Sequence, residues 1–201
     1  WLVFLLYMVL ATATMDFVRL FIPTLHNGFW YALLATTIVL IYGNINYRHP
    51  RVEHVTIDSE KLPAGDSYRI VLASDIHLGY GTTRSDLSRY VDMINREQGD
   101  VVLIAGDLID NSIRPVATED MCREFERIEA TDGIYLAPGN HEYISNIDSV
   151  AQYLRTTHVR LVRDSVGRLS DNIALIARDD RSNHHRRSLK ELSNEAGEQP
   201  I

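Results

Sequence analysis

Acidic and imidazole side chains with the spacing of metal ligands directly follow an apolar stretch of the chain. Asp75 and His77 lie one residue apart in the segment A-S-D-I-H-L-G-Y, which comes after the apolar residues 70–72. We interpret these apolar residues as a buried strand, so that both side chains can project from its carboxyl end into one site. A carboxylate and an imidazole are common ligands of transition metals. The pair alone is a weak signal, because Asp-x-His is frequent by chance.

Two later apolar runs, V-V-L-I-A and I-Y-L-A, end in polar groups of the same kind. The polar residues that follow them are, in chain order, Asp107, Asp110, Asn140, His141 and Glu142. A glycine directly before Asp107 and before Asn140 permits a tight turn that lifts the next side chain out of the strand. If the strands are parallel, their carboxyl ends meet at one edge of a sheet and these groups converge on one cleft. Mixed nitrogen and oxygen ligands suit zinc, manganese or iron.

The hydrophobic pattern predicts the elements that would position these groups. We expect strands over residues 69–73, 101–105, 134–137, 159–162 and 173–177, and helices over residues 86–96, 149–154 and 188–196. A further helix is expected to begin at Thr118, and residues 165–171 are interpreted as a turn in which Gly167 supplies the bend. Alternation of strands and helices predicts a layered α/β domain.

The first 47 residues have a different composition. Apart from Asp16 and Arg19 they carry no Asp, Glu, Lys or Arg, and Pro23 divides them into two apolar pieces. Each piece is long enough for a membrane helix of about 20 residues. The sequence therefore predicts an all-α transmembrane hairpin over residues 1–47, with a soluble hydrophobic hairpin as the alternative. The basic residues Arg48 and Arg51 after it favour the cytoplasmic face for the rest of the chain.

Length and charge narrow the remaining possibilities. The chain has 201 residues and a net charge of −7, which disfavours nucleic acid as a partner. Its single cysteine, Cys122, cannot form an internal disulfide. Because the chain begins with Trp1 and ends in a polar stretch, we expect it to be part of a longer protein. We divide it into the hairpin, a linker over residues 48–67 and a domain over residues 68–201.

Together, the three polar groups resemble the motifs of the calcineurin-like metallophosphoesterases, which are D-x-H, G-D-x-x-D and G-N-H-E in this order. Here they are Asp75-Ile76-His77, Gly106-Asp107-Leu108-Ile109-Asp110 and Gly139-Asn140-His141-Glu142. The resemblance is firm over residues 68–143. It implies an α/β fold with a layered, here incomplete, β-sandwich flanked by helices. Bacterial members of the family include membrane-anchored proteins, which suits the apolar hairpin.

The resemblance also implies roles for the site residues. Asp75 and His77 would bind one divalent metal ion, Asn140 a second, and Asp107 would bridge both ions, which would be Mn, Fe or Zn. Two ions about 3.5–4 Å apart activate a shared hydroxide for in-line attack on a phosphate ester.

The remaining motif residues have other implied roles. His141 would be catalytic, by stabilising the developing charge or protonating the leaving oxygen. Asp110 would accept a hydrogen bond from His141 and orient its ring. Glu142 would be structural.

The sequence departs from the family pattern in two ways. A late G-H-x-H motif and a separate preceding histidine are absent from these 201 residues, and Asn111 stands where protein phosphatases carry arginine. The second departure disfavours phosphoprotein substrates. The first leaves two hypotheses: a membrane-anchored phosphomonoesterase or phosphodiesterase with a lipid-linked substrate, or a membrane-tethered, non-catalytic binding or scaffold protein. A nuclease is disfavoured, because the basic cluster at Arg181, Arg186 and Arg187 is small.

Overall fold

The structure is a computed structural model that describes residues 1–63, 65–170 and 172–197. The chain divides into two compact units, Trp1–Ile57 and Asp58–Ile201. The second unit contains all of the motif residues. The finer domain boundaries given above stay predictions.

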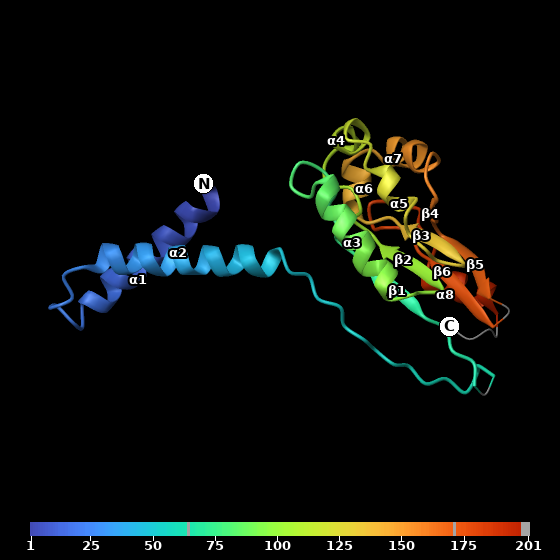
Figure 1. The fold of residues 1–201 in the computed structure, drawn as a ribbon, viewed down its shortest axis with the longest axis horizontal. Helices are drawn as coiled ribbons and strands as arrows, with labels where there is room; N and C mark the ends of the chain where they lie inside the picture. Colours follow the sequence, from blue (N-terminus) through green and yellow to red (C-terminus); the bar gives the residue numbers. More distant parts are fainter. Residues whose placement is uncertain (64, 171, 198–201) are drawn as a thin grey trace. The chain divides into compact units, whose positions relative to one another are not determined.

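The first unit is a pair of helices, α1 (Leu2–Arg19) and α2 (Gly28–Tyr47), packed against each other (Figure 1). The contact uses small residues on one face of α2, where Gly28, Ala32 and Thr36 are buried. Large apolar side chains cover the outside of both helices, and no residue of α1 is buried. Both helices are long and apolar enough to cross a membrane. The two charged residues of α1, Asp16 and Arg19, form an ion pair with 3.9 Å between Asp16 Oδ1 and Arg19 Nη1.

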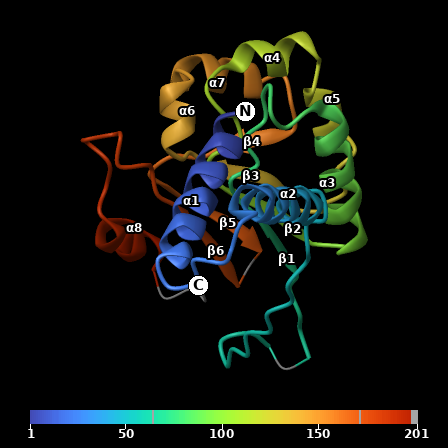
Figure 2. The same ribbon diagram turned by 90° about the vertical axis from the view of Figure 1, so that its left-hand side faces the viewer.

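The second unit contains a four-stranded parallel sheet in the order β1-β2-β3-β4. Its strands are β1 (Ile70–Ala73), β2 (Val101–Ala105), β3 (Gly133–Ala137) and β4 (Val159–Leu161). Each crossover is helical: α3 (Arg84–Arg96) follows β1, α4 (Ile113–Thr118) and α5 (Cys122–Phe125) follow β2, and α6 (Asn140–Ile144) and α7 (Ile147–Leu154) follow β3. In Figure 2, α4, α6 and α7 lie together at one end of the domain. The predicted mixed α/β fold with parallel strands is confirmed.

Helix α3 packs on this sheet through one apolar face. Leu87 and Val91 are buried in the same core as Val102 and Ile104 of β2. The helix begins at Arg84, two residues before the predicted start, because Thr83 and Asp86 form a capping box at its first turn. This packing holds β1 and β2 next to each other. The loops at the carboxyl ends of the two strands are therefore also neighbours.

Two further strands, β5 (Ser165–Ser170) and β6 (Ile173–Ala177), form an antiparallel pair, and α8 (Leu189–Ala196) contacts both. The prediction of a turn over residues 165–171 was therefore wrong for the part described, residues 165–170. Gly167 lies inside β5 and pairs with Leu175. These residues form a strand because they pair with β6, and the local sequence pattern that predicts a turn carries no information about such pairing.

Two other sequence interpretations were also wrong. Thr118 ends α4 instead of starting a helix; Ser112 caps α4, and Asp120, with a φ of 50°, separates it from α5. Residues 70–72 are not a fully buried strand, because Ile70 and Leu72 are 48% and 66% exposed. β1 is the edge strand, and its alternate side chains face away from the core.

Candidate metal centre

The loops after β1 and β2 run side by side beyond the ends of their strands. Backbone amides of the first loop donate to carbonyls of the second, from Asp75 to Gly106 (3.2 Å), from His77 to Asp107 (2.9 Å) and from Leu78 to Leu108 (2.8 Å). The pairing continues the parallel ladder, so the D-x-H and G-D-x-x-D motifs are held in fixed register. Leu78 and Ile109, both buried, lock this pair of loops into the core.

Three chemically important residues in these loops have a left-handed backbone. The φ values are 54° for Asp75, 51° for His77 and 54° for Asp107. Such conformations cost non-glycine residues about 1 kcal/mol or more and collect at functional sites. The neighbouring Gly106, at φ 83°, makes the same turn without that cost. The sharp turns expected at glycine therefore extend to the candidate ligands themselves.

Asp75, His77 and Asp107 offer a set of metal-ligand atoms. One atom from each lies within 4.8 Å of the other two, and His77 Nε2 is 3.9 Å from both Asp75 Oδ1 and Asp107 Oδ2. Ligands about 2.1 Å from a common ion stand about 3.0–3.4 Å apart at octahedral to tetrahedral angles. Each of the two distances from His77 Nε2 would need to shorten by less than about 1 Å to reach such a spacing, so the residues fit a first-row divalent ion.

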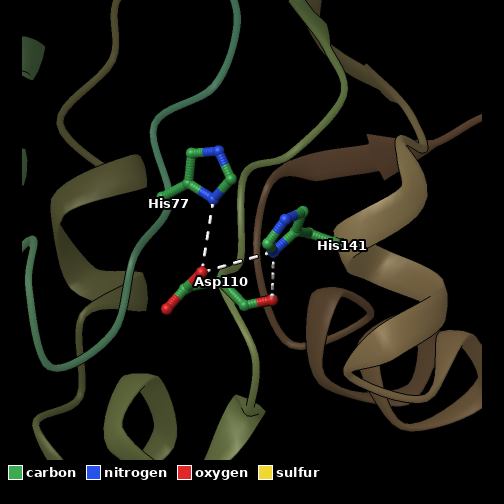
Figure 3. Close-up of side chains that lie close together, drawn as sticks. All are labelled: His77, Asp110 and His141. Carbon is green, nitrogen blue, oxygen red and sulfur yellow. Dashed lines mark hydrogen bonds and ion pairs between the residues drawn. The ribbon is translucent and has the colours of Figure 1, made fainter.

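Asp110 lies between two imidazole rings. Its Oδ1 is 3.4 Å from His77 Nδ1 and 3.3 Å from His141 Nδ1, as Figure 3 shows. The rings of His77 and His141 meet edge to face, with centroids 4.4 Å apart. The predicted proximity of Asp110 and His141 is present, and the carboxylate faces His77 as well.

The hydrogen bonding of His141 fixes where its proton sits. His141 Nδ1 is 3.1 Å from the backbone carbonyl oxygen of Asp110, which can only accept a hydrogen bond. Nδ1 must therefore carry the hydrogen, and in the neutral ring Nε2 is the nitrogen that can take up a proton.

His77, Asp110 and His141 form a second group whose ligand atoms lie within 4.8 Å of one another. The His141 atom that faces Asp110 in this group is Nδ1, which carries a hydrogen. We therefore favour the group of Asp75, His77 and Asp107 as the metal-binding one. His77 Nδ1 is buried and makes no hydrogen bond within the part of the chain described, which leaves it suited to donate to Asp110 while Nε2 serves as the ligand.

Glu142 is fully buried and holds the loops together. Its carboxylate accepts hydrogen bonds from the backbone amides of Asp107 (2.9 Å), Ile109 (3.0 Å) and Gly139 (2.8 Å). Asp107 Oδ1 in turn accepts from the amide of His141 (3.0 Å). Glu142 thus joins the loop after β2 to the start of α6, in agreement with the structural role predicted for it.

Asn140 is the first residue of α6 and is exposed. Both of its neighbours contact Asp107: the His141 amide donates to Oδ1, and a Cβ at Gly139 would overlap that same atom. Only glycine fits at position 139, so α6 can begin against the Asp107 side chain. The predicted roles of Asn140 and the other motif residues stay predictions.

Several residues considered in the sequence lie outside this group. His184 and His185 are exposed in a turn, as expected of a solvated loop, and the side chain of Cys122 lies outside the described part of the chain. Arg187 of the basic cluster pairs with Glu195 and donates to Asp164, so it serves the fold of the loop.

The sequence shows Asp179 only as part of a polar cluster at the end of the last strand, either at the rim of the cleft or in a solvated loop, and gives no sign that its carboxylate is buried beside α6. Asp179, two residues after the end of β6, has a side chain only 1% exposed. It accepts hydrogen bonds from Tyr143 Oη (2.8 Å), Arg163 Nε (2.9 Å) and Asn183 Nδ2 (2.9 Å). The signal that could have found it is the one that found Asp75 and Asp107, an acid shortly after an apolar strand.

Electrostatics keep this buried group ionised. Burial alone would raise the pKa of Asp179, but the hydrogen bonds donated by Asn183, Tyr143 and Arg163 outweigh it and lower the pKa below its usual value. Burial and the adjacent Asp179 carboxylate together raise the pKa of Tyr143 to about 12. Tyr143 is therefore a hydrogen-bond donor to an ionised carboxylate throughout the ordinary pH range.

Comparison with known proteins agrees with the fold and the site. Residues 68–195 match the family model for calcineurin-like phosphoesterases, which covers more than half of the chain. The chain therefore belongs to the calcineurin-like phosphoesterase family, as the order of its three motifs predicted.

The relatives found include proteins named for a membrane location. The chain is 41% identical over 116 residues to a Danio rerio protein named "Transmembrane protein with metallophosphoesterase domain", and 29% and 27% identical to uncharacterized metallophosphoesterases of Helicobacter pylori and Aquifex aeolicus. These matches cover 56%, 67% and 69% of this chain but 26%, 35% and 52% of the relatives. No solved structure matches significantly. With α1 and α2, the name of the Danio rerio relative, shared by a relative from Bos taurus, indicates membrane association.

Proposed function

We propose that this protein is a membrane-anchored, metal-dependent phosphoesterase that hydrolyses phosphomonoester or phosphodiester bonds. The observation that carries the proposal is the convergence of Asp75, His77 and Asp107, with ligand atoms within 4.8 Å of one another at the ends of adjacent parallel strands. In the part of the chain described, the ion pairs of these two carboxylates and of Asp110 involve only histidine. The concentrated negative charge favours a cation.

Two divalent ions, when bound, would supply positive charge that activates water and stabilises the phosphoryl oxygens. The protein's own part is to hold the ligands. The paired loops fix Asp75 and His77 against Asp107, and Asp110 orients the His77 ring from its far side. Asn140, at the start of α6, is the proposed ligand of the second ion.

His141 is the proposed proton carrier. Its Nδ1 atom is bound to the Asp110 carbonyl and faces the Asp110 carboxylate, so Nε2 is the atom that exchanges protons. The Asp110 carboxylate oxygen Oδ1 lies 3.3 Å from Nδ1 and helps to orient the ring. His141 can then donate a proton from Nε2 to the leaving oxygen of the ester.

The proposed substrate is a phosphate ester linked to a lipid. Two large side chains near the motifs support this choice: Tyr80, which is 83% exposed, and Ile144, which is 58% exposed and lies one helical turn after Asn140. They would contact the apolar part of an amphiphilic substrate. Changing Tyr80 and Ile144 to serine should slow hydrolysis of a long-chain phosphate ester in micelles and leave a soluble diester unaffected; equal rates for both variants and wild type would exclude this assignment.

The catalytic domain is proposed to face the cytoplasm, and the hairpin to cross the membrane twice. Support comes from Arg48 and Arg51 directly after α2. A cysteine at Ser59, in a Cys122→Ser background, should react with an impermeant maleimide only after cells are opened. Labelling of intact cells would place the domain on the other side.

The metal chemistry is tested with Asp107→Asn in the full chain, purified in detergent. Asp120→Asn is the matched control, because Asp120 is an exposed aspartate with a similarly left-handed φ of 50°. We expect Asp107→Asn to lower Mn²⁺ affinity and bis-p-nitrophenyl phosphate hydrolysis by at least about a hundredfold, and the control to match wild type. Wild-type protein without Mn²⁺ binding or hydrolysis would refute the proposal and favour the non-catalytic scaffold.

A further inference from the structure

The short helix α6 carries two residues of the proposed site but has little stability of its own. It spans only Asn140–Ile144, and helices of such length are unstable without tertiary contacts. The contacts at its first turn, described above, are made by the His141 amide to Asp107 and by the Glu142 carboxylate to the loop after β2. Its second turn is held differently, through Tyr143.

The contacts of Tyr143 are made to an ion pair outside the three motifs, between the buried Asp179 and the partly exposed Arg163. Tyr143 Oη donates to Asp179 and accepts from Arg163 Nη2 at 2.7 Å, while Arg163 Nε donates to Asp179 Oδ2 at 2.9 Å. The guanidinium carbon of Arg163 also lies 5.6 Å from the centre of the Tyr143 ring. Each of the three side chains therefore contacts the other two.

Asp179 is itself held from several sides. Its backbone amide donates to Asp164 Oδ1 (3.0 Å), and its carbonyl accepts from Arg186 (3.3 Å). Asp164 also accepts from the amide of Arg187 (3.0 Å). The backbone contacts of Asp179 thus hold it against the loops after β4 and β6, and its side chain contacts α6 through Tyr143.

Burying an ionised carboxylate costs several kcal/mol, and apolar residues can often fill such a position with no loss of stability. A stabilising role alone does not explain why Asp179 is charged. A network of directional hydrogen bonds, however, specifies one orientation of the group that it contacts, which an apolar contact does less well. The oriented group here is the helix that begins with Asn140 and His141.

We propose that Asp179 and Arg163 are positioning residues, which hold α6 through Tyr143 so that Asn140 and His141 keep their places beside Asp107 and Asp110. The relevance of this arrangement to metal binding rests on the proposed function. The Asn140 side chain is exposed, so its placement depends on the backbone of α6.

The structure offers a matched control for the test. Tyr68 donates to Asp132, which is likewise a tyrosine–aspartate hydrogen bond, but these residues precede β1 and β3, at the opposite edge of the sheet. Tyr68→Phe and Tyr143→Phe each remove one hydroxyl group. Both substitutions should lower the free energy of unfolding by comparable amounts, whereas only Tyr143→Phe should disturb α6.

The test uses the full chain in detergent, first without metal. We expect the backbone amide signals of Asn140 and His141 in ¹H–¹⁵N NMR spectra to shift in Tyr143→Phe and in Asp179→Asn, and to stay in place in Tyr68→Phe. Unchanged signals in Tyr143→Phe, or equal shifts in both tyrosine variants, would overturn the proposal. If Asp179→Asn does not fold, the milder Tyr143→Phe variant still decides the outcome.

A second measurement is the binding of Mn²⁺ alone by calorimetry. Tyr143→Phe should weaken the lower-affinity site about tenfold, the low end of the effects seen for residues that orient metal ligands, and Tyr68→Phe should match wild type. Equal Mn²⁺ affinity in Tyr143→Phe and wild type would overturn the positioning role. A wild-type protein that binds no Mn²⁺ would instead refute the proposed function, while the spectra of the metal-free protein would still decide whether Tyr143 positions α6.

Discussion

Replacing the buried Glu142 by glutamine should destabilise the domain strongly with almost no change in volume. Oε2 of Glu142 accepts from the amides of Asp107 and Gly139, and Oε1 accepts from the amide of Ile109. Glutamine has only one acceptor oxygen. If this oxygen takes the Oε2 position, the amide of Ile109 faces an NH₂ group and loses its partner.

The magnitude follows from these contacts. A buried amide without a partner costs about 1–3 kcal/mol, and a hydrogen bond to a neutral acceptor contributes about 1 kcal/mol less than one to a charged acceptor. One lost bond and two weakened bonds come to about 4 kcal/mol. Folded domains have only about 5–15 kcal/mol of stability, so the variant should fold but be clearly weakened.

Hydrogen exchange of individual amides is the suitable assay. Both tryptophans, Trp1 and Trp30, lie in the helical hairpin, so tryptophan fluorescence does not report on the domain. The core amides of β3 should exchange with a free energy of opening about 4 kcal/mol lower in Glu142→Gln.

The control is Glu195→Gln, because the Glu195 side chain is 49% exposed and forms an ion pair with Arg187. This substitution should lower the free energy of unfolding by less than about 1 kcal/mol. If Glu142→Gln lowers the opening free energy no more than this control does, the carboxylate does not hold the loops together and the reasoning fails.

Two further predictions concern the loops and the ion pair of Asp179 with Arg163. Gly139→Ala should lower the free energy of unfolding by about 1–3 kcal/mol through overpacking and weaken Mn²⁺ binding, because the new Cβ would lie 2.8 Å from the amide nitrogen of Asp107. The control is Gly167→Ala, because the space around a Cβ at that position is open. Equal melting temperatures for the two variants would contradict the prediction. Because the pKa of Asp179 is lowered from 3.8, its contribution to stability is complete above that pH and is lost as the pH falls through the lower, folded-state pKa. Urea unfolding should therefore show a difference between wild type and Asp179→Asn that is constant near neutral pH and shrinks below pH 3.8, and a difference independent of pH would argue against an ionised Asp179.

Much of the site could be predicted because its signals are local. Each motif is a short polar group after an apolar strand, and parallel pairing of β1, β2 and β3 suffices to bring His77, Asp110 and His141 together. The chemistry of the residue types and the topology of the sheet are both readable from the sequence. The roles of the individual residues are not tested by the geometry alone.

What could not be predicted depends on contacts between distant residues. Gly167 and its polar neighbours indicate a turn, but pairing with β6 makes them a strand. The residues of β1 are apolar on both faces, yet only Val71 packs against the core, because β1 is at the edge of the sheet. The pairing of Tyr143 with Asp179 spans 36 residues and has no local signal except the position of Asp179 after a strand.

The left-handed backbone at Asp75, His77 and Asp107 places the residues of the proposed metal site in conformations that lower the stability of the polypeptide. Glycine would relax all three turns, and asparagine would suit them as well. Selection of random variants for thermal resistance alone should therefore enrich these substitutions and, with them, proteins that have lost the proposed metal ligands. Attempts to raise the thermal stability of this protein should leave these three residues unchanged and introduce stabilising substitutions at other positions.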